Sequence, residues 1–234
     1  MSGKNYAAWK RKLGGASVAP FTPAAISGLT VWLKADAITG KSDGDAMSSW
    51  TDSSGNGNHA VQATGANQPL YKTGIVNGKP AVLFDDTNDK MVVAGLPVGV
   101  PLSVFVVYRN IGGAFTDRRA VSDNGAGSWL IGPHGGLHRA YVVGFLNGIA
   151  IDNALFVIAA VVQTGSGSTS FFANGAAGGT NTSDQPLTTL ALSDAGAPLN
   201  GYIAEVIYYS AALSAGQRAQ VTNYLATKYA ITAS

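Results

Sequence analysis

Few residues of this chain could hydrolyse a sugar bond. That reaction ordinarily requires two carboxylates that face each other across the substrate. Glu205 is the only glutamate, and the residues two positions before and after it are Ile203 and Ile207, so its expected strand carries no acid cluster. Aspartates could supply a pair from loops, but no sequence pattern brings them together. We therefore predict no catalytic residues and expect Glu205 to accept hydrogen bonds from a neighbouring strand or loop.

Two loops are rich in side-chain oxygen atoms. Residues 52–58 read DSSGNGN, and residues 85–89 read DDTND. Calcium prefers six to eight hard oxygen ligands, whereas the same residue types form Asx turns without a metal. Neither loop has the twelve-residue EF-hand pattern. A turn role is favoured and no cofactor is expected; the alternative is calcium, with Asp52, Asn56, Asp85 and Asp89 as the candidate ligands.

Two histidines have the spacing of a zinc site on a helix. His134 and His138 are four residues apart in GPHGGLHRA, but the proline and glycines there argue against a helix. Both are interpreted as loop histidines. The chain has no cysteine, which excludes disulfides and thiolate metal sites. It also lacks a nucleophile elbow and any phosphate-binding fingerprint.

Aromatic rings and polar loops are the groups that a lectin-like site would use. Rings stack on sugars, and polar side chains bind their hydroxyl groups. The residues that could line such a site are Asn124, Trp129, His134 and Tyr141. Most aromatic residues of a β-sandwich lie in its core, and a single sequence leaves both interpretations open.

The elements that must position these residues are mostly strands. Segment 29–35, LTVWLKA, alternates in polarity, and turn signals such as Asn77-Gly78, Asn147-Gly148 and Asn174-Gly175 recur along the chain. Segments 102–109 and 154–163 are almost wholly apolar, as is typical of central strands covered on both faces. The further strands are expected near 47–51, 59–63, 80–85, 90–94, 118–122, 128–131, 139–146, 168–173, 187–192 and 201–210.

One helix is expected in the body of the chain. Ser214 is a good N-cap for a helix from Ala215 to about Tyr229, with Val221 and Leu225 on its apolar stripe. One short helix with many strands predicts an all-β fold, an antiparallel jelly-roll sandwich. We place this domain at residues 26–234.

Residues 1–25 form an expected N-terminal arm and linker. Large apolar residues there recur at helical spacing among basic residues. Such a helix is too short to be stable alone, so docking on another subunit or on the domain is favoured over fraying. The residues expected to dock are Tyr6, Trp9, Lys10, Arg11, Lys12 and Leu13.

Four stretches of the domain resemble a known family. They are LTVWLKADAI at 29–38, SSWTDSSGNGNHAVQ at 48–62, IVNGKPAVLFDDTNDKM at 75–91 and GYIAEVIYYSAALSAGQRAQVTNYLATKYAI at 201–231. Their order and spacing resemble the concanavalin A-like, laminin-G-like jelly-roll modules of bacteriophage virion proteins and bacterial surface proteins. The resemblance implies the fold over about residues 26–231. It implies little about function, because this superfamily includes lectins, glycosidases and structural proteins. Its glycosidases carry a Glu-x-Asp-x-x-Glu cluster on one strand, which this chain lacks.

Charge and hydropathy exclude several classes of partner. Residues 1–15 carry four basic residues and no acid, and the rest of the chain carries 11 basic and 13 acidic residues. The domain therefore has no general nucleic-acid-binding surface. The longest apolar run has nine residues, whereas a membrane helix needs about 20, so no membrane insertion is expected. No Sec signal peptide is expected either, because the segment after Lys12 is too short and too rich in glycine.

These observations favour a non-enzymatic virion structural protein, either a bacteriophage head-decoration or a tail-associated protein. The arm would bind other virion proteins, so the chain would work as an oligomer or as part of a larger assembly in the virion. The alternative is a carbohydrate-binding adhesion module that recognises glycans. A polysaccharide hydrolase is the third hypothesis.

Overall fold

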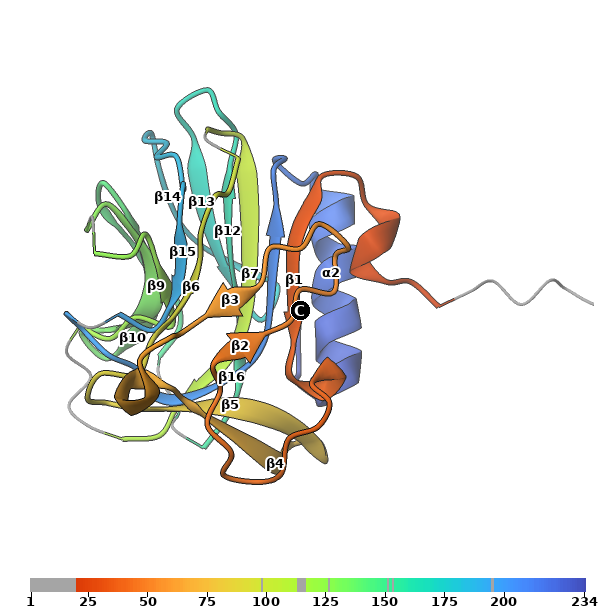
Figure 1. Cartoon of the computed structure of the whole chain (residues 1–234). Helices are drawn as coiled ribbons and strands as arrows, with labels where there is room; N and C mark the ends of the chain where they lie inside the picture. Colours follow the sequence, from red (N-terminus) through yellow and green to blue (C-terminus); the bar gives the residue numbers. More distant parts are fainter. Residues whose placement is uncertain are drawn as a thin grey trace, which may run out of the picture.

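The computed structural model describes residues 20–97, 99–112, 117–125, 127–150, 152, 154–194 and 196–234. These residues form two antiparallel β-sheets that face each other, with one helix outside them (Figure 1). The predicted all-β antiparallel sandwich with one C-terminal helix is confirmed. Most of the predicted arm, including all six residues expected to dock, lies outside the described residues.

The first sheet, sheet A, is built around the longest strands. In spatial order its strands are β14 (Ala176–Asn181), β13 (Thr169–Ala173), β12 (Val157–Gln163), β7 (Leu102–Asn110), β16 (Asn200–Tyr209), β5 (Lys79–Asp85) and β4 (Leu70–Val76), and β1 (Leu29–Lys34) also pairs with β16. The predicted apolar central strands are confirmed, because all but one residue of β7 and every residue of β12 are buried.

The second sheet, sheet B, consists of shorter strands. In spatial order these are β11 (Phe145–Leu146), β10 (Leu137–Val142), β9 (Trp129–His134), β8 (Val121–Ser122), β15 (Leu190–Leu192), β6 (Met91–Val93), β3 (Ala60–Val61) and β2 (Ser49–Trp50). The 3-10 turns are η1 (Pro23–Ala25), η2 (Ala35–Ala37) and η3 (Gly65–Asn67).

Turn chemistry explains which strand predictions hold. Asn77-Gly78 and Asn174-Gly175 have positive φ at both residues and form two-residue hairpin turns, as their sequence signals indicate, although the strands β4 and β14 that they connect were not predicted. Asn147-Gly148 forms no hairpin. Gly135-Gly136 forms the turn between β9 and β10, and the strand predicted at 139–146 is divided into β10 and β11 at Val143-Gly144, where Val143 has a positive φ. Gly148 is needed for another reason, because a Cβ there would lie 1.8 Å from the carbonyl oxygen of His138.

The helix α2 (Ala215–Tyr229) has the bounds that the sequence predicts. Ser214 Oγ accepts a hydrogen bond from the backbone N–H of Gln217, whose side chain in turn accepts one from the N–H of Ser214, a complete capping box. Val221, Leu225 and Tyr229 are buried. The helix therefore packs one apolar face on the sandwich.

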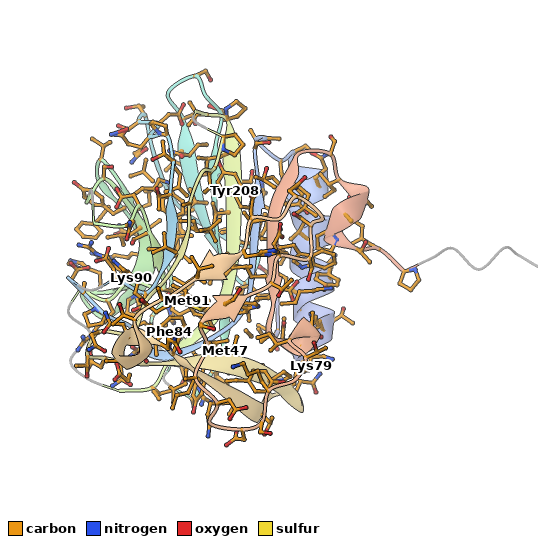
Figure 2. The ribbon with its side chains drawn as sticks, in the orientation of Figure 1. Met47, Lys79, Phe84, Lys90, Met91 and Tyr208 are labelled. Carbon is orange, nitrogen blue, oxygen red and sulfur yellow. The ribbon has the colours of Figure 1, made fainter. Side chains whose placement is uncertain are left out.

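The fold has two hydrophobic cores, one on each face of sheet A. The main core lies between the sheets, where Figure 2 shows Met47, Phe84, Met91 and Tyr208. The second core lies between sheet A and α2, and it includes Phe105 and Ile207. The outer face of sheet A is thus covered by the helix, whereas no helix of the described residues covers the outer face of sheet B (Figure 1).

A bulge in β16 turns Glu205 toward the helix. The pairing with β7 shifts by one residue between Ile203 and Glu205. As a result Ile203 faces the main core while Ile207 faces α2. The simple alternation that placed Glu205 between two isoleucines on one face is therefore wrong, because the inserted residue Ala204 changes the side-chain direction.

The Glu205 carboxylate joins three elements. It is fully buried and accepts hydrogen bonds from Trp32 Nε1 at 2.5 Å, Lys228 Nζ at 2.7 Å and Tyr229 OH at 2.7 Å. Trp32 belongs to β1, and the other two donors belong to α2. Lys228 Nζ also contacts Asp36 Oδ1 at 2.8 Å. This confirms the predicted acceptor role of Glu205, with a charge partner that the sequence did not reveal.

We predict that Lys228→Met lowers the free energy of unfolding by about 3–5 kcal/mol, because it leaves a buried carboxylate without its cation. The double variant Glu205→Gln/Lys228→Met should recover part of that loss. Urea denaturation measures both, with Thr227→Ala as the control on the same helix. A loss from Lys228→Met no larger than that of the control would contradict the predicted role.

Candidate functional site

The outer face of sheet B carries a cluster of aromatic side chains at its β9–β11 edge. The turn Gly135-Gly136 sends β10 back along β9, and β11 pairs with β10 so that Tyr141 lies opposite Phe145. Along β10, Arg139 and Tyr141 are half-buried, whereas His138, Ala140 and Val142 are fully buried. The alternation of a strand therefore separates an outward set of side chains from a core-facing set.

The rings of this cluster are in direct contact. Phe145 stacks on His134 with ring centroids 4.1 Å apart and an interplanar angle of 23°. Tyr141 meets Phe145 edge to face at 5.0 Å, and the guanidinium carbon of Arg139 lies 5.7 Å from the centre of the Phe145 ring. Phe145 is 44% exposed. We call these four residues, His134, Arg139, Tyr141 and Phe145, the aromatic platform.

The platform combines apolar ring faces with polar groups that are not used elsewhere. Within the described part of the chain, Arg139 takes part in no ion pair, and Tyr141 OH makes no hydrogen bond to another residue. Aromatic rings with polar edges are suited to ligands that have one apolar and one hydroxylated face. Such a surface can stack on a sugar ring while its edges donate hydrogen bonds to the hydroxyl groups.

The structure brings together two of the four predicted ligand-binding residues, His134 and Tyr141. Trp129 is fully buried in the main core, so its prediction as a ligand-binding ring is corrected: it points inward from β9 and cannot reach a ligand. Asn124 lies in the β8–β9 loop, where its Oδ1 accepts a hydrogen bond from Lys90 Nζ at 3.1 Å.

Sequence reasoning missed Arg139 and Phe145. Strand parity could have found Arg139, which lies two residues from Tyr141 on β10, whereas Phe145 reaches the same face as the cross-strand partner of Tyr141 on β11. The hairpin that brings His134 onto the same face could not be read in this way, because the turn at Gly135-Gly136 was not predicted.

The two histidines of GPHGGLHRA do not meet. His134 lies on the outer face of sheet B, whereas His138 is only 3% exposed and its Nδ1 lies 2.6 Å from Tyr108 OH in the main core. Within the described ranges, no group of three or more His, Asp or Glu side chains could hold a metal ion. Burial lowers the pKa of His138 to about 4 and raises the pKa of Tyr108.

The oxygen-rich loop at 52–58 is held by its own aspartate. Asp52 accepts hydrogen bonds from the backbone N–H groups of Trp32, Ser54 and Asn58 and from Ser54 Oγ. Asn56 Nδ2 donates to the carbonyl oxygen of Leu29 at 2.9 Å. These contacts are those of the favoured turn role, and calcium at this loop stays an untested prediction.

The second oxygen-rich loop contains a carboxyl group in an unusual environment. Asp85 Oδ1 accepts a hydrogen bond from the N–H of Thr87, and Asp89 Oδ2 accepts one from the N–H of Asp85. Asp89 is 4% exposed. Burial, together with the nearby charge of Asp85, raises the pKa of Asp89 to about 6. Calcium at this loop likewise stays a prediction.

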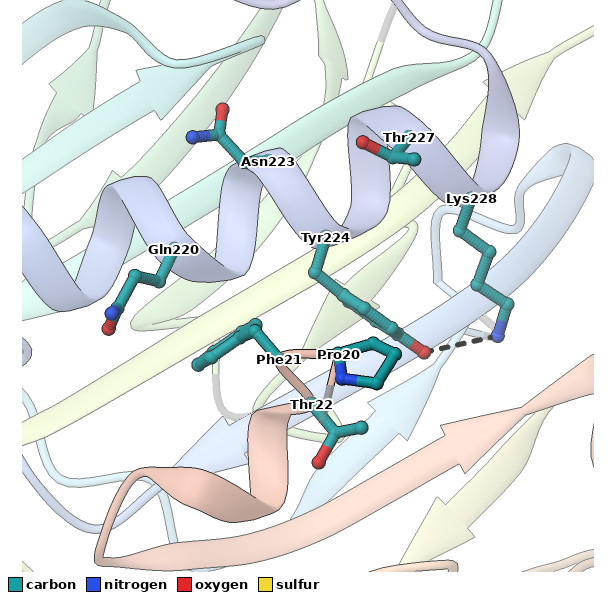
Figure 3. Close-up of a pocket in the computed structure, with 8 residues that line it drawn as sticks. All are labelled: Pro20, Phe21, Thr22, Gln220, Asn223, Tyr224, Thr227 and Lys228. Atoms are coloured by element: carbon teal, nitrogen blue, oxygen red, sulfur yellow. Dashed lines mark hydrogen bonds between the residues drawn. The ribbon is translucent and has the colours of Figure 1, made fainter. Parts of the chain in front are cut away.

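A groove runs along α2 at the point where the described chain begins. Its volume is about 600 Å³, and it is formed by Pro20 and Phe21 on one side and by Tyr224 and Lys228 on the other (Figure 3). The rings of Phe21 and Tyr224 meet edge to face at 6.5 Å. The last residues of the predicted linker therefore pack on the domain, and Tyr209 OH donates to the carbonyl oxygen of Pro23 at 2.9 Å.

The basic pair Arg118-Arg119 is neutralised by acids. Arg118 pairs with Asp86, and Arg119 Nη1 lies 3.0 Å from Asp194 Oδ2. Both guanidinium groups of this pair are therefore compensated by carboxylates. No helix among the described residues is long and apolar enough to cross a membrane.

Comparison with known proteins identifies the fold. No protein-family model matches the chain, and no curated protein matches it. One similar solved structure is domain 4 of AbnA, a GH43 extracellular arabinanase from Geobacillus stearothermophilus, in complex with arabinotriose. The match has a TM-score of 0.60 and 17% sequence identity, and it covers 83% of this chain and 97% of that chain. The likeness shows the fold alone.

Two larger enzymes contain a similar unit. A GH54 α-L-arabinofuranosidase matches with a TM-score of 0.56 and 17% identity over 79% of this chain and 51% of its own. The Trypanosoma rangeli sialidase matches with a TM-score of 0.54 and 13% identity over 96% of this chain and 38% of its own. The present chain thus spans about half or less of these enzymes.

We predict that the shifted pKa values of His138 and Asp89 make the stability of the fold change with pH in opposite directions. Neutral His138 stabilises the fold fully above its ordinary pKa of about 6.5, and this contribution is lost as the pH falls toward about 4, by up to about 1.4 kcal/mol per pH unit. Protonated Asp89 contributes stability at low pH, and this contribution is lost as the pH rises through about 6.

Urea denaturation between about pH 4 and pH 7 separates the two contributions. His138→Gln should remove the loss of stability on acidification, and Asp89→Asn should make that loss steeper than in the wild type. If either variant keeps the wild-type pH profile, the corresponding assignment is wrong.

Proposed function

We propose that this chain is a non-enzymatic carbohydrate-binding domain whose binding surface is the aromatic platform. The observation that carries the proposal is the contact of three aromatic rings with a guanidinium that pairs with no described carboxylate, on the outer face of sheet B. Such a surface offers ring faces for stacking and hydrogen-bond donors at their edges. A domain of the same fold, domain 4 of AbnA, has been solved in complex with arabinotriose, which supports a glycan as the ligand class.

The chemistry of the carboxylates supports a binding role over hydrolysis. Glycoside hydrolysis needs two carboxyl groups on either side of the substrate. Glu205 is fully buried and is held by Lys228 and Tyr229 beneath α2, away from any substrate. A polysaccharide hydrolase based on an aspartate pair remains the alternative, and cleavage of a polysaccharide that is abolished by alanine at one aspartate would establish it.

A second candidate function is display on a bacteriophage particle, as a head-decoration or tail-associated protein anchored by the N-terminal arm. The observation that favours it is the placement of the two surfaces. Pro20, where the described chain begins, lies on the α2 side of the molecule, and the aromatic platform lies on the opposite side, on the outer face of sheet B (Figure 1). An anchor on one side would leave the other side facing outward.

The platform is tested on a glycan array, with calcium and with a chelator. We expect the wild-type domain to bind at least one glycan, and Tyr141→Ala/Phe145→Ala to bind it at least about tenfold more weakly, a loss of about 1.4 kcal/mol. Val61→Ala is the matched control, because Val61 is also exposed on sheet B. Unchanged binding by the double variant, or no binding by the wild type, would refute the proposal.

The anchor is tested by deleting residues 1–19. We expect the truncated chain to unfold at a temperature close to that of the full chain, because the described fold begins at Pro20, and to be absent from assembled particles. Incorporation of the truncated chain at the normal level would eliminate the arm as the anchor.

A further inference from the structure

A second, smaller pocket lies at the end of the core between α2 and sheet A. Its volume is about 330 Å³, and four segments meet around it: the β4–β5 turn, the segment that leads into β12, the β13–β14 turn and the residues after α2. Its polar lining residues include Asn77, Arg109, Asn174 and Thr232. The pocket is separate from the aromatic platform and from the groove on α2.

Among the described residues, Arg109 is the only charged one that lines this pocket. Its guanidinium carbon lies 5.1 Å from the ring centres of both Phe156 and Tyr202, so the charge caps two aromatic rings. Among the described residues no carboxylate pairs with Arg109, and its Nε is buried without a hydrogen-bond partner. The guanidinium is therefore oriented by the rings while its charge stays uncompensated.

Other polar groups of the lining favour an anion. Within the described chain, Thr232 Oγ1 has no hydrogen-bond partner, and Asn174 uses its Oδ1 to accept from the N–H of Ile158 while its Nδ2 has no partner. The carbonyl groups at the end of α2 are partly capped, since Asn77 Nδ2 donates to Lys228 O and the N–H of Ile231 donates to Ala226 O. The guanidinium of Arg109 and Asn174 Nδ2 are thus donors in the lining that no described carboxylate or carbonyl group uses.

The apolar residues of the lining indicate the chemistry of the rest of the ligand. Ile75, Val76, Leu155, Phe156 and Ile231 supply apolar surface. Pockets of this kind, with apolar walls and a few convergent polar groups, are typical of small-molecule sites. A guanidinium fork matches a carboxylate with two parallel hydrogen bonds. A carboxylate attached to a compact six-membered ring would place the ring against the apolar lining residues and the carboxylate group against the guanidinium of Arg109.

We propose that this pocket binds a small ring-shaped carboxylate, with the guanidinium of Arg109 holding the carboxylate group. The ring can come from two sources, an aromatic acid or an acidic sugar. The proposal does not rest on glycan binding by the aromatic platform, because none of its residues belongs to that surface.

Isothermal titration of the full chain tests the pocket with two pairs of probes. Benzoate is compared with benzyl alcohol, and glucuronate is compared with glucose. We expect one carboxylate of the two to bind at a single site and its neutral counterpart to bind at least tenfold more weakly. Binding of benzoate alone identifies an aromatic acid, and binding of glucuronate alone identifies an acidic sugar.

Substitutions of Arg109 then test whether the carboxylate binds in this pocket. Arg109→Gln should weaken binding of the carboxylate at least tenfold, and Arg109→Lys, which keeps the charge and the packing of the stem, should weaken it less. The matched control is Arg218→Gln, which removes another guanidinium that makes no ion pair in the described chain and lies over the ring of Phe172, outside the pocket. It should leave the affinity unchanged. The inference is overturned if neither carboxylate binds, if a neutral probe binds equally well, or if Arg218→Gln causes the loss.

Discussion

The buried carboxylate of Glu205 is the constraint on which the arrangement of sheet A and α2 depends. A charge removed from water must be paired and hydrogen-bonded, or the fold is strongly destabilised. Glu205 obtains its partners from β1, through Trp32, and from α2, through Lys228 and Tyr229. One carboxylate thereby fixes the position of an early strand and of the helix relative to the central strand β16. The same enclosure removes the only glutamate from contact with a substrate.

Once α2 is fixed on sheet A, the two faces of the sandwich take different roles. The helix covers the outer face of sheet A and creates the second core, with the α2 groove and the Arg109 pocket at its margins. No described element covers the outer face of sheet B in this way, and its β9–β11 edge presents the aromatic platform. The α2 groove thus runs along the helix, the Arg109 pocket lies at its end, and the proposed glycan-binding surface lies on the sheet that no described helix covers.

The elements with local signals could be predicted from the sequence, and those that depend on distant contacts could not. The Ser214 cap and its stripe define α2 correctly because both signals lie within the helix itself. Strand β14, which contains Gly178 and Gly179, was missed because its residues are too small to show a polarity pattern. Those glycines are needed for a close approach between the sheets, since a Cβ on Gly179 would lie 2.6 Å from the backbone nitrogen of Asn147. The bulge at Ala204 and the burial of Trp129 likewise depend on neighbours far along the chain.

The position of β16 also has a consequence for how the protein is synthesised. This strand pairs with β1, β5 and β7, yet it is the last strand in the chain order. The nascent chain emerges from its N-terminal end and folds as whole domains, so sheet A lacks its central strand until almost all of the domain has left the ribosome. During that interval the apolar side chains of β7 and β12 are not yet buried by the rest of the fold. Translation speed and chaperones that bind extended apolar segments should therefore influence the yield of this protein more than its compact native state suggests.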